Sequence, residues 1–198
     1  MLSAESLKRI DREIAKYPID KKQSAVMSAL AIAQEEKGWL ANETMDFVAE
    51  YLGMPPIAVY EVATFYNMYN LQPVGKYKIT ICTNLPCALS GSNEIAAYVK
   101  KELGIEFNQT TPDGKFTLKE GECLGACGDA PVLLVNNKRM CSFMSNEMID
   151  KLLEELGGVE PGEAGAGWLR VGLPHTLPVE VALRRLAGSL VFPSPAPT

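Results

Sequence analysis

Residues 76–87 have the sequence KYKITICTNLPC, and the fold and the chemistry of the chain both begin here. Apolar Tyr77, Ile79 and Ile81 alternate with polar Lys78 and Thr80. Strict alternation with period two predicts a half-buried β-strand over residues 76–82, with its polar residues facing solvent. The strand ends on a cysteine, and a second cysteine, Cys87, follows in what we expect to be a loop.

The residues that follow extend this strand into an α+β unit over residues 73–157. SNEIAAYVKKEL at 92–103 predicts a helix that ends at Gly104, and Asp113-Gly114 predicts a turn before a short strand at 116–118. VLLV at 132–135 predicts a buried strand, which Asn136-Asn137 turns into another strand running through Met140 and Phe143. With a last helix capped by Ser145, the expected order is β-α-β-β-β-α.

Residues 1–72 predict four short helices forming a separate subdomain. The first carries an apolar stripe from Leu7 to Tyr17, and the second opens at a capping-box variant, Asp20-x-x-Gln23. On the second helix Val26, Met27, Leu30 and Ala31 are expected to face the core. Asn42 is the expected N-cap of the third helix and Gly53 its C′ residue, while Pro55-Pro56 starts the fourth.

The end of the chain has a different composition. Residues 158–198 contain twelve Pro or Gly residues and no lysine, which predicts a flexible tail. The only histidine, His175, lies in this tail. A single histidine excludes two-histidine Rieske centres and paired-histidine zinc sites, so the chemistry is expected to depend on sulfur.

Charge and hydropathy narrow the class of protein further. The net charge of −5 argues against a nucleic-acid-binding module, which presents a basic face. No apolar stretch approaches the length of a membrane span, and the N-terminal residues lack the features of a signal or transit peptide. The expected location is the cytosol, where clustered cysteines are more often metal ligands or redox groups than disulfides.

Four of the five cysteines form two close pairs. Cys82 and Cys87 are separated by four residues, Cys123 and Cys127 by three, and the second pair lies in the glycine-rich stretch GECLGACG. Three interpretations compete: a 2Fe–2S cluster on four thiolates, a four-cysteine zinc site, or a dithiol redox pair or plain buried thiols. Spacing alone leaves the metal open. The fifth cysteine, Cys141, is expected to pack as a small apolar residue.

Three long segments resemble a known family. They are YPIDKKQSAVMSALAIAQEEKGWL at 17–40, LGMPPIAVYEVATFYNMYNLQPVGKYKITICTNLPC at 52–87, and DGKFTLKEGECLGACGDAPVLLVNN at 113–137. Residues 15–157 are similar to the small 2Fe–2S protein (E-type, 24-kilodalton class) of respiratory complex I, NADH:quinone oxidoreductase. The resemblance implies a helical N-terminal region followed by a thioredoxin-like domain with one 2Fe–2S cluster. It also implies the cluster ligands Cys82, Cys87, Cys123 and Cys127.

The resemblance further implies an electron-transfer role within a larger enzyme. FMN and NADH are expected on a neighbouring flavin/NADH-binding subunit, because this chain has no nucleotide-binding fingerprint of its own. Other partners would be further peripheral-arm subunits of complex I, on the cytoplasmic side of the inner membrane. No complete active site is expected in this chain alone. The alternatives are the equivalent subunit of an NAD-dependent hydrogenase or formate dehydrogenase, and a zinc-stabilised assembly module.

Overall fold

The computed structural model describes residues 1–158, which belong to one compact unit of the chain. The predicted tail at 158–198, with His175, therefore lies outside the described residues apart from its first position. Within the described part, no helix is long and apolar enough to cross a membrane. Most of the hydrophobic core of this part belongs to two clusters, one formed by residues between Leu2 and Tyr69 and one by residues between Tyr77 and Leu156, and a third, small cluster contains Val132. A domain boundary at residues 72 and 73 stays a prediction.

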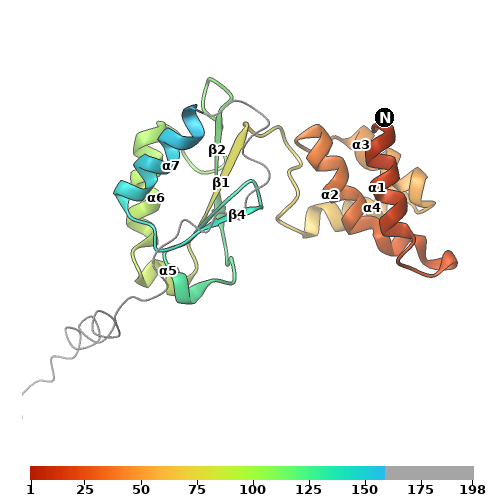
Figure 1. Cartoon of the computed structure of the whole chain (residues 1–198), viewed down its shortest axis with the longest axis horizontal. Helices are drawn as coiled ribbons and strands as arrows, with labels where there is room; N and C mark the ends of the chain where they lie inside the picture. Colours follow the sequence, from red (N-terminus) through yellow and green to blue (C-terminus); the bar gives the residue numbers. More distant parts are fainter. Residues whose placement is uncertain (159–198) are drawn as a thin grey trace, which may run out of the picture. The chain divides into compact units, whose positions relative to one another are not determined.

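The helical region contains the four expected helices (Figure 1). They are α1 (Ala4–Ile14), α2 (Val26–Lys37), α3 (Asn42–Leu52) and α4 (Pro56–Phe65). Pro56 stands at the first turn of α4, and Gly53 ends α3 in the left-handed conformation, both as predicted. The side of α3 that faces the core is buried: Met45, Val48, Ala49 and Leu52.

The start of α2 was predicted wrongly. A 3-10 helix, η1 (Ile19–Ala25), lies before it, and α2 begins at Val26 without a side-chain cap. An N-cap residue must be extended, whereas Asp20 already lies inside this 3-10 helix, so it does not cap α2. On α2 itself, Met27 and Ala31 are exposed and the buried stripe consists of Val26, Ala29, Leu30, Ile32 and Ala33.

Two smaller expectations about helix ends were also wrong. The N-cap of α3 is the extended residue Ala41, and Asn42 is the first helical residue. The helix α1 ends at Ile14, so Tyr17 lies beyond it and is 41% exposed instead of continuing the apolar stripe. Cap positions depend on single backbone conformations, which a sequence pattern places only to within a residue or two.

The second region is a four-stranded sheet with helices, in the order β2-β1-β3-β4. The strands are β1 (Tyr77–Cys82), β2 (Phe116–Gly121), β3 (Leu133–Val135) and β4 (Arg139–Cys141). β1 is parallel to β2 and antiparallel to β3, and β3 is antiparallel to β4. The helices are α5 (Leu85–Leu89), α6 (Ser92–Leu103) and α7 (Asn146–Gly158), with the 3-10 turn η2 (Cys127–Asp129). The predicted β-α-β-β-β-α order is confirmed, with α5 as an addition.

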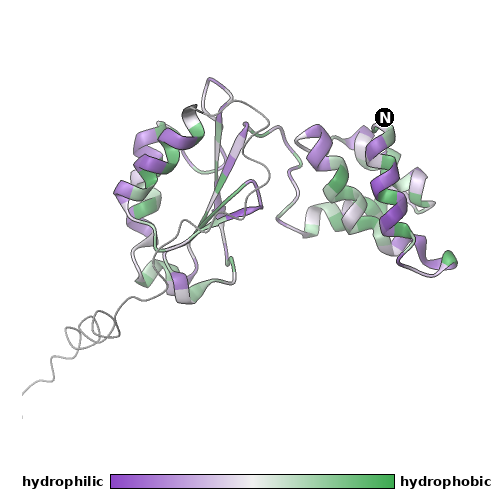
Figure 2. Cartoon of the chain, viewed as in Figure 1, coloured by the Kyte–Doolittle hydropathy of each residue, from purple (hydrophilic) through white to green (hydrophobic). Residues whose placement is uncertain are grey.

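One face of the sheet packs against α6 and α7, whose apolar sides contribute to the same core (Figure 2). Ile79 and Ile81 of β1 meet Val99 of α6 and Ile149 of α7 in this core. Both bounds of α6 agree with the prediction, and Ser145 caps α7 through a hydrogen bond from the Met148 N–H at 3.4 Å. The two asparagines predicted to turn β3 into β4 have φ of 51° and 56°, as a type I′ hairpin turn requires.

β1 is buried on both faces, in contrast to the half-buried strand that was predicted. Lys78 is 4% exposed, and its Nζ donates a hydrogen bond to Asn70 Oδ1 at 2.7 Å. Burial, with a smaller contribution from Lys119, lowers the pKa of Lys78 to about 8. The alternating pattern misleads here because a residue from outside the sheet, Asn70, contacts the side chain of Lys78.

The last predicted strand is shorter than expected. β4 ends at Cys141, and Phe143 lies beyond it with a φ of 54°, a conformation that strands do not use. The backbone N–H of Phe143 donates instead to the carbonyl of Asp129 at 2.8 Å. A long-range contact with the second cysteine segment therefore ends the strand.

Candidate metal centre

The parallel pairing of β1 with β2 brings the two cysteine segments to the same edge of the sheet. In this register Cys82, the last residue of β1, lies opposite Gly121, the last residue of β2. The ladder continues one step further, since the Thr83 N–H donates to the Gly121 carbonyl at 2.9 Å. Cys123 follows two residues after Gly121. The carboxyl ends of the two strands thus bring the start of each cysteine segment to the same edge of the sheet.

Gly121 allows the two strands to approach closely at this edge. A Cβ atom there would lie 2.8 Å from Thr80 Cγ2 and 3.3 Å from the Ile81 carbonyl oxygen. Both distances are shorter than ordinary contacts, so a larger residue would force β1 and β2 apart. The glycine therefore holds the two cysteine segments at their observed separation.

Cys82 and Cys87 form the buried half of the site, each with 1% of its surface exposed. Together with Val132 they make a small apolar cluster of their own. Cys87 lies within the short helix α5, not in a loop as predicted, because Asn84 to Leu89 close one helical turn. Burial and the hydrogen bond with Cys82 raise the pKa of the Cys87 thiol, and a hydrogen bond with the backbone of Val132 opposes that shift.

Cys123 and Cys127 form the exposed half. The Gly125 N–H donates to Cys123 Sγ at 3.4 Å, and Gly125 has a φ of 71°, which suits glycine. Cys127 begins η2, whose turn is closed by a hydrogen bond from the Asp129 N–H to the Ala126 carbonyl at 3.0 Å.

Cys127 adds a small electrostatic contribution to the raised pKa of the Cys87 thiol, so the two halves lie within range of each other's charge. Within residues 1–158, no three or more Cys, His, Asp and Glu side chains lie close enough together to hold a metal ion. The donors nevertheless fit an iron–sulfur cluster chemically. All four are thiols, Gly125 supplies an N–H to one sulfur, and soft thiolates are the ligands that such clusters use.

The fifth cysteine has a different environment. Cys141 ends β4 and packs, partly buried, against the core of the sheet region, as predicted for a small apolar residue. Burial raises the pKa of its thiol. Nothing in its surroundings marks it as a ligand.

Two features of the site were missed from the sequence. Val132 closes the cluster around Cys82 and Cys87, and the Cys82 N–H donates to its carbonyl at 3.1 Å. Residues after β4 also fix the second cysteine segment: Ser142 Oγ donates to Asp129 Oδ2 at 3.1 Å, and the Met144 N–H donates to the Pro131 carbonyl at 3.0 Å. These hydrogen bonds join residues far apart in the sequence, so no local sequence pattern predicts them.

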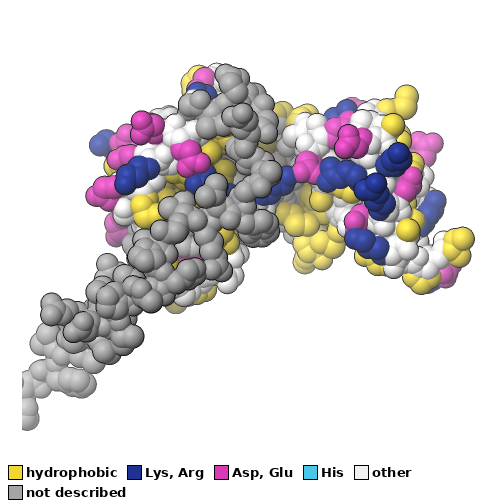
Figure 3. Space-filling view, viewed as in Figure 1, with side chains coloured by type: hydrophobic (Ala, Val, Ile, Leu, Met, Phe, Trp, Pro, Cys, Tyr) yellow, Lys and Arg dark blue, Asp and Glu magenta, His cyan; other side chains and the backbone are white. Residues whose placement is uncertain are grey.

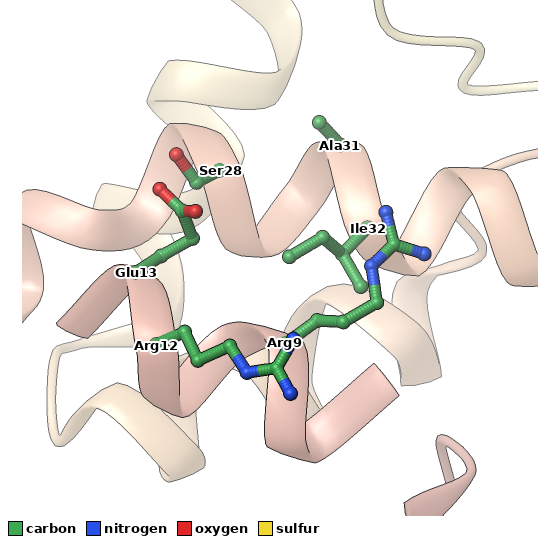
Figure 4. Close-up of a pocket in the computed structure, with 6 residues that line it drawn as sticks. All are labelled: Arg9, Arg12, Glu13, Ser28, Ala31 and Ile32. Atoms are coloured by element: carbon green, nitrogen blue, oxygen red, sulfur yellow. The ribbon is translucent and has the colours of Figure 1, made fainter. Parts of the chain in front are cut away.

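A hollow in the helical region does not belong to this site. It lies between α1 and α2, has a volume of about 370 Å³ and is lined by Arg9, Arg12, Glu13, Ser28, Ala31 and Ile32 (Figure 4). It contains no cysteine, and Arg9 is already paired with Glu35. Figure 3 shows Lys and Arg side chains on the surface of this region. We regard the hollow as an ordinary feature of a charged helical surface.

Comparison with known families identifies the class of protein to which this arrangement belongs. The family described as thioredoxin-like [2Fe-2S] ferredoxin matches residues 10–157, which include both cysteine pairs and the whole sheet. The chain is a member of this family, and membership implies one 2Fe–2S cluster. The predicted α+β, thioredoxin-like fold is thereby confirmed.

Two individual relatives show a more specific similarity than the family as a whole. The chain is 47% identical over 143 residues to the E-type subunit of NADH-quinone oxidoreductase from Rickettsia felis, covering 72% of this chain and 85% of that protein. It is 41% identical over 162 residues to the mitochondrial NADH dehydrogenase [ubiquinone] flavoprotein 2 of Dictyostelium discoideum, covering 81% and 65%.

A solved structure supports the fold. A chain of an NAD+-reducing [NiFe]-hydrogenase has a TM-score of 0.56 at 21% identity, and the match covers 65% of this chain and 22% of that one.

Proposed function

We propose that this chain is the 2Fe–2S electron-transfer subunit of an NADH:quinone oxidoreductase, with Cys82, Cys87, Cys123 and Cys127 as the cluster ligands. The register of Cys82 opposite Gly121 carries the proposal, because it brings two separate cysteine pairs to one edge of the sheet. The names of relatives that share 41–47% of its residues support the same role. Such identity favours this enzyme over a hydrogenase or formate dehydrogenase.

The bound cluster would accept and release one electron at a time. The chain's own residues hold it and adjust its charge balance: the strand end and α5 fix Cys82 and Cys87 in an apolar pocket, and the Gly125 N–H points at Cys123 sulfur. Backbone N–H groups stabilise anionic sulfur without adding a titratable group. Amide donors and exclusion of water are thus the means by which this chain would set the reduction potential.

The rest of the reaction would take place on partner subunits. FMN and NADH are assigned to a flavin/NADH-binding partner, and further peripheral-arm subunits would accept the electrons. In this proposal the chain works on the cytoplasmic side of the inner membrane, attached through the complex.

The proposal is tested on the full chain purified without oxygen. We expect a coloured protein with iron and acid-labile sulfide in the ratio of a 2Fe–2S cluster, and an EPR signal of a reduced 2Fe–2S centre after dithionite treatment. The chain should also co-purify with the flavin-binding subunit. A colourless protein with stoichiometric zinc would refute the proposal and favour the zinc-stabilised module.

A further inference from the structure

The helical region and the sheet region have separate apolar cores. The core of the helices contains residues from Leu2 to Tyr69, and that of the sheet begins at Tyr77. Within residues 1–158, no apolar side chain belongs to both of these clusters. Regions that share no core can open independently, because proteins open in cooperative units of different stability. Any coupling between the two regions must therefore come from other contacts.

A segment at the end of the helical region, residues 68–70, is hydrogen-bonded to both regions. The carbonyl oxygen of Met68 accepts a hydrogen bond from Gln34 Nε2 of α2 at 3.0 Å. It accepts another from Asn137 Nδ2, in the turn between β3 and β4, at 2.7 Å. A carbonyl oxygen has two lone pairs, so each region uses one of them. Met68 thus joins α2 to the β3–β4 turn.

Asn70 makes a second connection between the regions. On the helical side, its carbonyl accepts from the Leu40 N–H at 2.8 Å, and its Nδ2 donates to the Gly38 carbonyl at 3.4 Å. On the sheet side, its Oδ1 accepts from Lys78 Nζ at 2.7 Å. Because Lys78 lies in β1, this bond connects the residues after α2 to the strand that ends at Cys82.

The bond from Lys78 to Asn70 is specific because the lysine is buried. Burial lowers the pKa of Lys78, since it removes an ammonium group from water. A buried polar group costs free energy unless it is hydrogen-bonded, and the Oδ1 atom of Asn70 is within hydrogen-bond distance of the amine. A packing of the two regions that lacked this bond would leave the amine buried and unpaired. The bond therefore favours one arrangement over others.

A third contact between the regions is exposed and electrostatic. Lys138, which follows Asn137 in the same turn, forms an ion pair with Glu35 of α2, and Glu35 also pairs with Arg9 of α1. The Lys138 and Glu35 side chains are 61% and 40% exposed, so water and salt screen their attraction. We expect this pair to contribute less than the two hydrogen bonds.

We propose that residues 68–70, together with Lys78 and Asn137, form a polar junction that makes the helical region and the sheet region open as one cooperative unit. Lys78 and Asn137 are the sheet side of the junction, and α2 with the residues that follow it is the helical side. The proposal goes beyond the proposed function and does not depend on which metal the cysteines bind.

Hydrogen exchange of the full chain, followed by mass spectrometry of its peptides, tests the junction. Peptides from α2 and α3 report on the helical region, and peptides from β1 and β2 report on the sheet. In the wild type, the slowest amides of both regions should have the same protection factor. Lys78→Met combined with Asn137→Gly should separate the two protection factors by at least about tenfold. Glycine suits the left-handed backbone of Asn137, whose φ is 56°, so the turn is retained.

A matched pair within the sheet region provides the control. Lys119 Nζ donates to Asn108 Oδ1 at 3.0 Å, and Asn108 has a left-handed φ of 66°. Lys119→Met combined with Asn108→Gly therefore makes the same two kinds of substitution and removes a Lys–Asn hydrogen bond. It leaves every bond to residues 68–70 in place. The two regions should keep a common protection factor in this variant, whatever the change in overall stability.

Two results would overturn the inference. Different protection factors in the wild type would mean that the regions are not coupled, and a common protection factor in the junction variant would mean that other contacts couple them. If the double variant does not fold, Asn137→Gly alone decides, with an expected separation of at least about threefold. The proposed function is judged separately, by the 2Fe–2S signal of the wild type, so each proposal can fail while the other stands.

Discussion

The two halves of the candidate site are built in different ways. Cys82 and Cys87 are almost fully buried and are held by a central strand and a helical turn, so the fold alone positions them. Cys123 and Cys127 are exposed and lie in a segment whose only regular element is the three-residue η2. The difference suggests that the protein prepares one half in advance, while the bound group completes the other.

The largest effect that can test this comparison is loss of the cluster. Replacing any one of the four cysteines by Ala should abolish the 2Fe–2S EPR signal, because each is a proposed ligand of the cluster. Cys141→Ala should keep the signal. A variant of Cys123 or Cys127 that retains a wild-type spectrum would remove that residue from the ligand set.

In the absence of the cluster, the same variants should differ in their free energy of unfolding. In the apoprotein, Cys87→Ala should lower the free energy of unfolding by about 1–2 kcal/mol, because it leaves a small cavity in an apolar cluster. Cys123→Ala should change it by less than about 0.5 kcal/mol, as exposed positions usually do. Urea unfolding of the apoproteins measures both, and equal losses would contradict the distinction between the halves.

Reactivity of the thiols provides a second comparison. In the apoprotein, Cys123 and Cys127 should react with a thiol reagent at least about 100-fold faster than Cys82 and Cys87, since the buried pair reacts only after local opening. Mass spectrometry of peptides from a time course gives the four rates. Uniform rates would mean that the buried half is not preformed.

Gly121→Ala tests the close approach of the strands that join the halves. The added Cβ would lie 2.8 Å from Thr80 Cγ2, so we expect a loss of about 1–3 kcal/mol in stability and weaker retention of the cluster. Thr80→Ser removes that methyl group and should restore part of the loss in the double variant. If the double variant loses as much stability as the two single variants together, this contact is not the cause.

The buried strand that supports the first half should make the stability depend on pH. Folding lowers the pKa of Lys78 from 10.5 to about 8, so between these values the folded chain binds fewer protons than the unfolded chain. Stability should therefore rise as the pH increases from about 8 to 10.5. Lys78→Met should remove this rise, which denaturant titrations over that pH range would detect. If the stability of the Lys78→Met variant still rises with pH, other titratable groups cause the rise.

Much of the fold follows from local sequence patterns. The bounds of α6 lie where a helix-forming stretch meets Gly104, and the two asparagines after β3 adopt the left-handed backbone that a tight hairpin needs. The two cysteine pairs could likewise be predicted as such, because each is defined by a short spacing in the sequence. These features are set by neighbours in the sequence.

The features that were mispredicted depend on distant neighbours. Lys78 is buried where its Nζ binds Asn70, a residue outside the sheet, and an alternating pattern cannot reveal such a contact. Phe143 leaves the strand because its N–H binds the Asp129 carbonyl, 14 positions earlier in the chain. The helical turn that contains Cys87 is too short for periodicity to detect. The first two features are decided by tertiary packing, which overrides local preference.

The pairing of Cys82 with Gly121 has a consequence for how such chains can vary over evolutionary time. Each cysteine pair is attached to the end of a strand, and these two strand ends are paired with each other. The residues that connect the pairs therefore contribute only the crossover between the two strands. Insertions or deletions in that crossover would leave the sulfurs where they are, whereas one residue added within either pair would displace a ligand. Descendants of this chain should thus conserve the two short spacings and diverge freely in the long one.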